Sequence, residues 1–177
     1  FLLTAGGLLL WAVIKKMPER LARLTVFLNP NFDPQGTGYH IKQALLAIGT
    51  GGIFGLGLGH SRQKFQYLPE VSGDSIFAIM AEELGFILTV VFIILIILLV
   101  WKLLRAAQAT NNGFVRLYLA GLAIWIGGQS LINIGAMLGV MPLTGVPLPF
   151  ISYGGTALMT ILAASGMAVR MTREVTQ

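Results

Sequence analysis

The densest group of side chains that could do chemistry lies in the run HSRQKFQYLPEVSGD, residues 60–74. It holds two cations, Arg62 and Lys64, and two carboxylates, Glu70 and Asp74. Lysine and arginine hold phosphate oxygens by charge-assisted hydrogen bonds. A carboxylate can take the proton of an attacking hydroxyl. The group favours a substrate with a phosphate group and a polar head, with the cations binding the phosphate and a carboxylate able to accept a proton.

These side chains also have plainer interpretations. Asp74 precedes a long apolar run and could cap a helix, where an acidic residue is stabilised by about 0.3–1 kcal/mol. The sequence pattern alone favours this capping role, which is compatible with catalysis. Arg62 and Lys64 could instead contact lipid headgroups, at about 1 kcal/mol each.

Other polar residues lie inside apolar segments. Glu82 and Glu83 follow Asp74 by eight and nine residues, or about 12–14 Å along a helix. Carboxylates at that depth are costly and face protein or water. We interpret them as structural, with one pairing to a basic residue of another helix. Gln129 and Asn133 share one helix face and are interpreted as hydrogen-bond partners between helices.

A proline-rich segment, PLTGVPLPFISYGG (142–155), contains no acid or base. Its prolines forbid a continuous helix. We expect it to form a shaped wall beside a groove, with Pro147, Pro149, Ser152 and Tyr153 in supporting roles.

Metal and thiol chemistry find little support. The chain has no cysteine, which excludes a disulfide framework, a thiolate metal site and a cysteine nucleophile within it. His40 and His60 have no partner at the helical spacing of metal ligands and are expected to be polar loop residues. No metal ligand is therefore assigned, although a divalent cation could assist a departing pyrophosphate.

The composition indicates the class of protein in which these residues lie. Of 177 residues, 55% are hydrophobic and 11% are charged, whereas soluble domains carry about 25% charged residues. We expect an all-α, multi-pass membrane protein with about four transmembrane helices. Its parts are a truncated helix at 1–14, a large loop at 15–73, and three transmembrane helices in 74–177 (about 84–101, 117–138 and 151–169).

Within the large loop, the stretch 41–59 is apolar but contains six glycines. Each glycine costs about 1 kcal/mol in a helix interior. A re-entrant or interfacial element held by protein therefore fits this stretch better than a spanning helix.

The short loops give the orientation. Lys102, Arg105 and Arg116 flank one turn, and Arg170 and Arg173 follow the last apolar run. The positive-inside rule puts this turn and the C-terminus in the cytoplasm, and it puts the 15–73 loop outside the cell. Nucleic acid is therefore not expected as a partner.

Two long motifs closely resemble the SEDS family of bacterial envelope proteins, the FtsW and RodA group. They are GLGLGHSRQKFQYLPEVSGDSIFAIMAEELGF (55–86) and NIGAMLGVMPLTGVPLPFISYGG (133–155), and the resemblance runs from about Arg20 to Arg170. The S-x-QK-x-x-YLPE run is more similar to FtsW than to RodA. The resemblance implies ten helices in the bacterial cytoplasmic membrane, of which this chain covers the seventh to the tenth.

The same resemblance implies a function. Family members are peptidoglycan glycosyltransferases that polymerise lipid II, beside a class B penicillin-binding protein and other divisome proteins. The family's essential aspartate matches Asp74, which the resemblance makes the candidate general base, with Arg62, Lys64 and Glu70 as candidate substrate-binding residues. The family usually has His-Thr before this aspartate, in a PE-x-HTDFIF run, whereas this chain has Ser72-Gly73. One ring is lost there, so the resemblance does not say how Asp74 is oriented.

Two alternatives remain open beside the enzyme. A lipid II flippase or transporter would be compatible with Glu82, Glu83 and broken helices. A non-catalytic scaffold that activates the penicillin-binding protein would be compatible with the altered run before Asp74.

Overall fold

The computed structural model of the chain describes residues 18–29, 36–61, 63 and 73–176. The regular elements of these residues are all α-helices, as predicted. They are α2 (Pro18–Leu28), α3 (Thr37–Thr50), α5 (Ile76–Ala109), α6 (Gly113–Met137) and α7 (Gly155–Thr176). The truncated helix expected at 1–14 lies outside the described residues.

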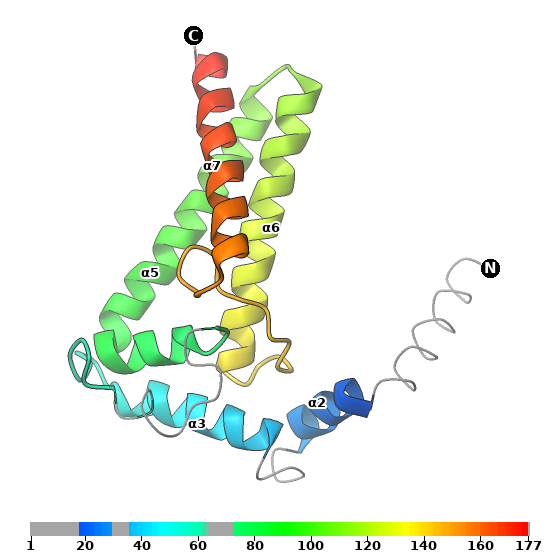
Figure 1. The fold of residues 1–177 in the computed structure, drawn as a ribbon. Helices are drawn as coiled ribbons and strands as arrows, with labels where there is room; N and C mark the ends of the chain where they lie inside the picture. The colour runs from blue at the N-terminus through cyan, green and yellow to red at the C-terminus, as the bar shows by residue number, and fades with distance from the viewer. Residues whose placement is uncertain (1–17, 30–35, 62, 64–72, 177) are drawn as a thin grey trace.

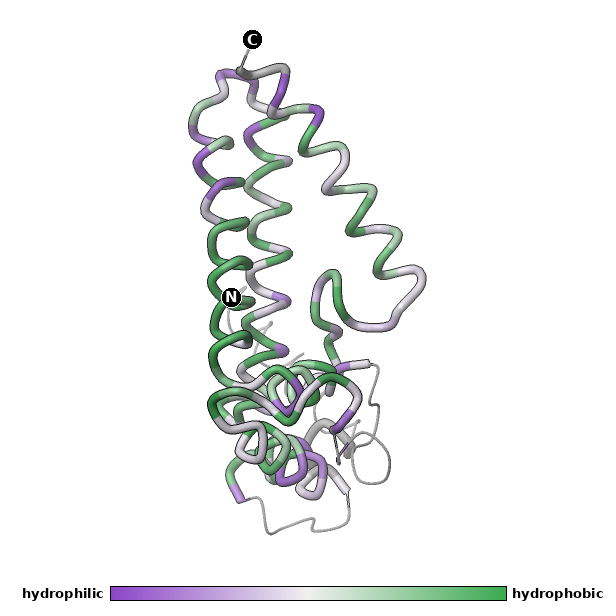
Figure 2. Tube along the Cα trace, turned by 90° about the vertical axis from the view of Figure 1, so that its left-hand side faces the viewer, coloured by the Kyte–Doolittle hydropathy of each residue, from purple (hydrophilic) through white to green (hydrophobic). Residues whose placement is uncertain are grey.

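The helices form two parts (Figure 1). The first, the crosswise layer, consists of α2, α3 and residues 73–84 at the lower end, and the connection 138–154 rises from this layer to the start of α7. The second, the upright bundle, consists of residues 86–109 of α5 together with α6 and α7. Helix α7 approaches the other two near the C-terminal end of the bundle and diverges from them toward the crosswise layer (Figure 2).

The upright bundle has an apolar exterior. Helices α5 and α6 are each long and apolar enough to cross a membrane, and Figure 2 shows them mostly in the hydrophobic colour. Leu95 and Ile97 of α5 are each 59% exposed, and Trp125 of α6 is 45% exposed. Such a surface is stable in lipid rather than in water. The span predicted at 151–169 corresponds to α7, which begins only after the proline-rich connection.

The end of the bundle away from the crosswise layer carries the basic turn. Asn112 caps α6, because its Oδ1 accepts hydrogen bonds from the backbone N–H groups of Phe114 (3.0 Å) and Val115 (3.4 Å). The Arg105 guanidinium lies 5.3 Å from the ring centre of Trp101, in a cation–π contact. The C-terminus lies at this same end (Figure 1), so the structure groups the two basic segments that the orientation argument uses.

Each part has its own apolar core. One core joins α2, α3, the start of α5, the end of α6 and the connection, through residues such as Val26, Ala44, Phe77, Met137 and Leu148. The other joins the three upright helices through residues such as Leu103, Leu119, Ile126, Ile161 and Ala168. The crosswise layer is thus packed against the bundle as a folded unit, not draped over it as a loop.

The junction between the two parts is a sharp break in α5. Gly85 has φ 77° and ψ 179°, so the helix stops and restarts there. In a straight helix, the N–H groups of Phe86 and Ile87 would donate to the carbonyls of Glu82 and Glu83. The break removes both bonds and leaves two donors and two acceptors to be satisfied elsewhere.

The glycine-rich segment after α3 supplies those partners. The N–H groups of residues 86 and 87 donate to the carbonyls of Gly52 (2.9 Å) and Ile53 (3.3 Å). In return, the N–H groups of Leu56 and Gly57 donate to the carbonyls of residues 82 and 83, both at 3.0 Å. The two segments therefore exchange the bonds that each would make alone as a helix. We call this arrangement the backbone exchange.

Glycine is required where the two backbones cross. Gly55 has φ 80°, in the left-handed region that favours glycine. A Cβ atom on Gly55 would overlap the carbonyl oxygen of Glu83, and one on Gly85 would overlap the backbone nitrogen of Gly55. The stretch 41–59, predicted not to span the membrane, thus contains the last ten residues of α3, a 14-residue helix that is too short to cross, and a turn that is hydrogen-bonded to α5.

Candidate functional site

Asp74 lies in the turn 73–75 immediately before α5, at the inner face of the crosswise layer. Its side chain is half-buried. Ser75, not Asp74, is the N-cap residue of α5, and no side-chain hydrogen bond caps the helix. The capping interpretation is therefore wrong, because the chain turns one residue later than the sequence pattern indicated. The carboxylate is available for another role.

Asn133 of α6 fixes the backbone of this turn. Its Nδ2 donates to the carbonyl of Asp74 at 2.9 Å and to the carbonyl of Val146 at 2.7 Å. Asn133 is 1% exposed, so both bonds are shielded from water. One buried amide thus ties the candidate base to the proline-rich connection. The predicted structural role of Asn133 is confirmed, although its partners are a turn and a loop instead of a second helix.

The other face of the Asp74 carboxylate looks toward Gly145 in that connection. A Cβ atom on Gly145 would lie 4.0 Å from Oδ2 of Asp74 and 3.8 Å from Nη1 of Arg23. Gly145 has φ 71°, a backbone conformation that favours glycine. Arg23 also donates from Nη1 to the carbonyl of Leu143 at 3.3 Å. The structure therefore brings a cation from α2 and the carboxylate of Asp74 close to the same position beside Gly145.

Two further side chains lie behind the carboxylate. The hydroxyl of Ser75 donates to Oδ1 of Asp74 at 3.3 Å. The same Oγ lies 2.6 Å from Nε2 of His40 in α3. Ser75 is fully buried. His40 was expected to be a polar loop residue, and that expectation is wrong because the residue belongs to α3 and its ring turns inward.

Glu82 anchors the segment that leads into the polar run. Its carboxylate is 1% exposed and accepts hydrogen bonds from the hydroxyls of Ser61 (2.5 Å) and Thr50 (3.5 Å). These hydroxyl partners come from the end of α3 and the following loop, and the predicted pairing with a basic residue of another helix stays a prediction. Glu83 is half-buried, and its Oε1 is buried with no hydrogen-bond partner among the described residues.

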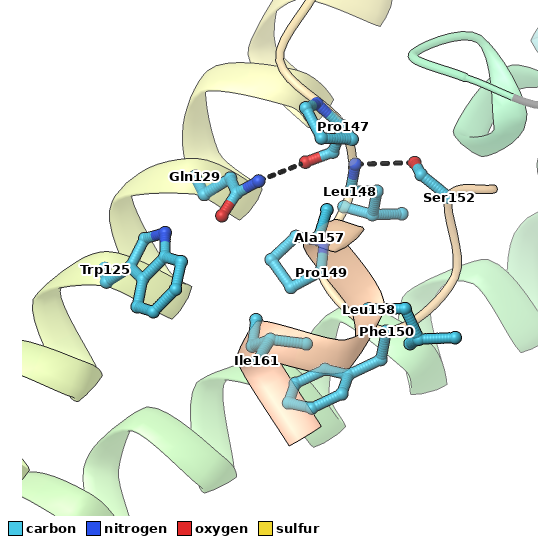
Figure 3. A pocket seen from close by; sticks show the side chains of 10 residues that line it. All are labelled: Trp125, Gln129, Pro147, Leu148, Pro149, Phe150, Ser152, Ala157, Leu158 and Ile161. Carbon is cyan, nitrogen blue, oxygen red and sulfur yellow. Dashed lines mark hydrogen bonds between the residues drawn. The ribbon is translucent and has the colours of Figure 1, made fainter. Parts of the chain in front are cut away.

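The proline-rich connection packs against α6 and α7. Gln129 donates to the carbonyl of Pro147 at 2.8 Å, and the Leu148 N–H donates to the hydroxyl of Ser152 at 2.6 Å, as Figure 3 shows. The cavity beside them has a volume of about 30 Å³, which is room for one water molecule. On this side the connection is packed closely against the helices.

The supporting residues are therefore not equivalent. Pro149 and Ser152 are buried and Pro147 is half-buried, so these three stabilise the shape of the connection. Tyr153 is 85% exposed and stands apart from that packing. Phe150 has φ 68°, which is strained for a bulky side chain.

Three predicted site residues, Arg62, Lys64 and Glu70, lie outside the described residues. In their place the structure brings Arg23 and His40 to Asp74, and the sequence pattern assigned neither to the site. Both belong to short helices far from residue 74 in the chain, so only the tertiary fold shows the proximity. The one available signal was that each is a polar residue in a segment that is otherwise rich in apolar residues.

A metal ion has little to bind among the described side chains. Within that part of the chain, no three histidine, aspartate or glutamate residues gather. Asp74 could offer one carboxylate to an ion that arrives with a pyrophosphate, but this donor set is too small to hold a resident metal. Participation of a divalent cation stays a prediction.

Comparison with known proteins gives a consistent result. A family model described as cell cycle protein, FtsW/RodA/SpoVE, matches residues 1–177. The probable peptidoglycan glycosyltransferase FtsW of Coxiella burnetii is 45% identical over 175 residues, covering 97% of this chain and 46% of that protein. Stage V sporulation protein E of Bacillus subtilis is 44% identical over 161 residues, covering 91% and 44%. The chain spans about half the length of these relatives.

Solved structures agree in fold. A chain of a peptidoglycan synthase complex, described as coordinating polymerization and crosslinking, superposes with a TM-score of 0.70 at 32% identity and covers 99% of this chain and 48% of that one. An aspartate-to-alanine mutant of the rod shape determining protein RodA of Thermus thermophilus superposes with a TM-score of 0.57 at 37% identity, covering 76% and 40%.

Proposed function

Because this chain belongs to the FtsW/RodA/SpoVE family of cell cycle proteins, we propose that its full-length protein is a peptidoglycan glycosyltransferase that polymerises lipid II. The observation that carries the proposal is the half-buried Asp74, whose backbone is held by Asn133 and whose Oδ2 shares the space beside Gly145 with Arg23. A relative at 45% identity bears the name probable peptidoglycan glycosyltransferase. The arrangement suits a reaction in which one group accepts a proton while negative charge develops nearby.

The proposed reaction is glycosyl transfer with inversion at the anomeric carbon. The 4-hydroxyl of an acceptor lipid II attacks C1 of the sugar at the reducing end of the growing strand. Asp74 takes the proton of that hydroxyl as the new C–O bond forms. The bond to undecaprenyl pyrophosphate breaks, and the electron pair leaves with the diphosphate. Arg23, together with Arg62 and Lys64 of the polar run, stabilises the charge that develops there.

The location of the site fits a substrate anchored in lipid. Asp74 stands where the crosswise layer meets helices that have an apolar exterior. In the proposed orientation, the basic turn at 102–116 and the C-terminus lie in the cytoplasm and the crosswise layer lies outside. A sugar carried on a membrane lipid then reaches the carboxylate at the outer surface of the cytoplasmic membrane. A class B penicillin-binding protein and other divisome proteins are the proposed partners, and nucleic acid has no proposed role.

The test replaces the carboxylate alone. Asp74→Asn in the full-length protein, assayed with its penicillin-binding partner and labelled lipid II, is expected to abolish glycan chains because the amide cannot act as a base. Expression and elution on size-exclusion chromatography should be unchanged. Asp33→Asn, which alters the only other aspartate of the chain, is the matched control and should polymerise normally.

The same preparation separates the enzyme from its alternatives. Substantial chain growth by Asp74→Asn would rule out the base role. Translocation of lipid II headgroups in proteoliposomes without chain growth by the unaltered protein would favour a flippase. Polymerisation only by the partner, unaffected by Asp74→Asn, would favour a scaffold.

A further inference from the structure

We propose that His40 is a positioning residue for Asp74, which acts through the hydroxyl of Ser75 and leaves Oδ2 as the oxygen that takes the proton. This inference rests on the proposed function, because it concerns how the candidate base is oriented. It assigns different tasks to the two oxygens of one carboxylate. It also assigns a role to a helix, α3, that contributes no residue to the proposed chemistry.

The direction of the hydrogen bonds follows from a count of protons. A serine hydroxyl has one proton to donate. When Ser75 gives that proton to Oδ1 of the ionised Asp74, its oxygen can only accept from Nε2 of His40, 2.6 Å away. His40 must therefore carry a proton on Nε2. The result is two successive hydrogen bonds, from Nε2 of His40 to the Ser75 hydroxyl and from that hydroxyl to Oδ1 of Asp74.

These two hydrogen bonds restrict a side chain that otherwise has freedom to rotate. Asp74 lies between Gly73, which has no side chain, and Ser75, just before the helix begins. Of these two neighbours in the sequence, only Ser75 can hold the carboxylate. Asn133 holds only the backbone carbonyl. The bond from Ser75 breaks the equivalence of the two oxygens. Oδ2 then faces the space beside Gly145, which Nη1 of Arg23 also approaches.

The position of His40 explains why its effect must be indirect. Its ring contacts Ser75 instead of the carboxylate, and the Ser75 side chain is fully buried. The hydroxyl therefore has no bulk water to replace the imidazole as a donor. Loss of the ring would remove the donor that directs the Ser75 hydroxyl toward Oδ1. The bond to Oδ1 is made in a shielded environment, where alignment of a base matters most, and it would weaken.

A purely structural role would have different consequences. The pair joins α3 to the start of α5, so removal of the ring could simply loosen that packing. Loosening would alter stability and substrate binding together. Misalignment of the base would lower kcat and leave KM near its original value, because substrate binding does not depend on which oxygen faces the hydroxyl.

The experiment uses the full-length protein with its penicillin-binding partner and measures polymerisation of labelled lipid II over a range of concentrations. Four variants are compared: His40→Leu, His40→Gln, Ser75→Ala, and the double variant His40→Leu/Ser75→Ala. We expect His40→Leu and Ser75→Ala each to lower kcat about 10- to 100-fold, with KM changed by less than about twofold. His40→Gln keeps an N–H donor and should recover most of the rate.

The double variant and a second histidine complete the design. Because both residues act through one hydrogen bond to Oδ1, the double variant should lose no more than either single variant. His60 is exposed and its ring lies near the carbonyl of Leu58, so His60→Leu is the matched control and should behave as the unaltered protein. If His40→Leu fails to fold, the kcat and KM values of Ser75→Ala and His40→Gln still test whether His40 positions Asp74.

Several results would overturn the proposal. They are a normal kcat in a folded His40→Leu or Ser75→Ala variant, multiplicative losses in the double variant, or a rise in KM alone. A His40→Gln variant as impaired as His40→Leu would also contradict it. Absence of polymerisation by the unaltered protein would instead refute the proposed function.

Discussion

The crosswise layer and the upright bundle are stabilised by different interactions. In the crosswise layer, hydrogen bonds of main-chain groups and short polar side chains hold the segments together. Examples are the backbone exchange and the two bonds from Asn133 to the carbonyls of Asp74 and Val146. In the upright bundle, apolar side chains meet at the helix interfaces and also cover the outer surface. The directional hydrogen bonds that fix atoms relative to one another are therefore concentrated at the end of the molecule where Asp74 lies.

This difference has a physical reason. In lipid, no hydrophobic driving force favours one apolar neighbour of a helix over another, because hydrocarbon tails are as apolar as leucine. Polar groups withdrawn from water must find partners or lose several kcal/mol. A site that needs atoms fixed relative to one another is therefore best built where polar groups are buried and paired. The comparison predicts large effects of substitutions in the crosswise layer and small ones on the lipid-facing surface.

The largest effect on stability is expected from Gly85→Ala. At φ 77° and ψ 179° Gly85 lies in a backbone region that is essentially restricted to glycine, where another residue costs about 1–3 kcal/mol, and here the Cβ would also overlap the backbone of Gly55. The two segments would have to separate, which breaks all four bonds of the backbone exchange. Thermal unfolding in detergent should show a large fall in midpoint or no folded protein.

The control makes the same change in the upright bundle. A Cβ atom on Gly121 of α6 meets nothing within 4 Å, so Gly121→Ala should leave the midpoint unchanged or slightly raised. Equal midpoints for the two variants would remove the distinction between the two parts.

An intermediate effect is expected from Glu82→Ala. The change removes the acceptor of the Ser61 and Thr50 hydroxyls at a site that is 1% exposed, at a cost of about 1–3 kcal/mol. The loop after the backbone exchange should then open more often. Trypsin should cleave faster after Arg62 and Lys64, which mass spectrometry of timed digests would detect.

Glu83→Ala is the paired variant for that measurement. The buried Oε1 of Glu83 has no hydrogen-bond partner among the described residues, so its removal should have little effect on cleavage. Faster cleavage in Glu83→Ala than in Glu82→Ala would show that the anchor has been assigned to the wrong carboxylate.

The smallest effect is expected on the outer surface of the bundle. Leu95 is 59% exposed, and Leu95→Ala should change the free energy of unfolding in lipid by less than about 0.5 kcal/mol. Ile126 is 1% exposed, and Ile126→Ala should cost about 2 kcal/mol or more. A steric-trap measurement in bicelles would compare them. Similar losses would mean that Leu95 contacts protein instead of lipid.

The sequence predicted the upright bundle better than the crosswise layer. A long apolar run indicates a spanning helix whatever lies beside it, so α5 and α6 were predicted with errors only at their ends. Helix α5 extends past Lys102 and Arg105 to Ala109, because charged side chains at the end of a helix can reach water without ending it.

The crosswise layer depends on contacts that no local pattern contains. The backbone exchange joins residues 52–57 to 82–87 through main-chain atoms alone, and the sequence shows only that glycines are frequent there. His40 meets Ser75 across 35 positions. Asp74 itself was found from its residue type and surroundings, but its capping role was predicted wrongly because a helix start can shift by one residue without changing the pattern.

The backbone exchange also constrains how the protein is made. Residues 52–57 leave the ribosome before residues 82–87, so their two N–H and two carbonyl groups have no native partner until the second segment arrives. The newly inserted α5 can meanwhile form a straight helix through Gly85 with its own bonds intact. If α5 first forms that straight helix, it must bend at Gly85 when the earlier segment docks, and it exchanges two bonds within one helix for four bonds between two segments.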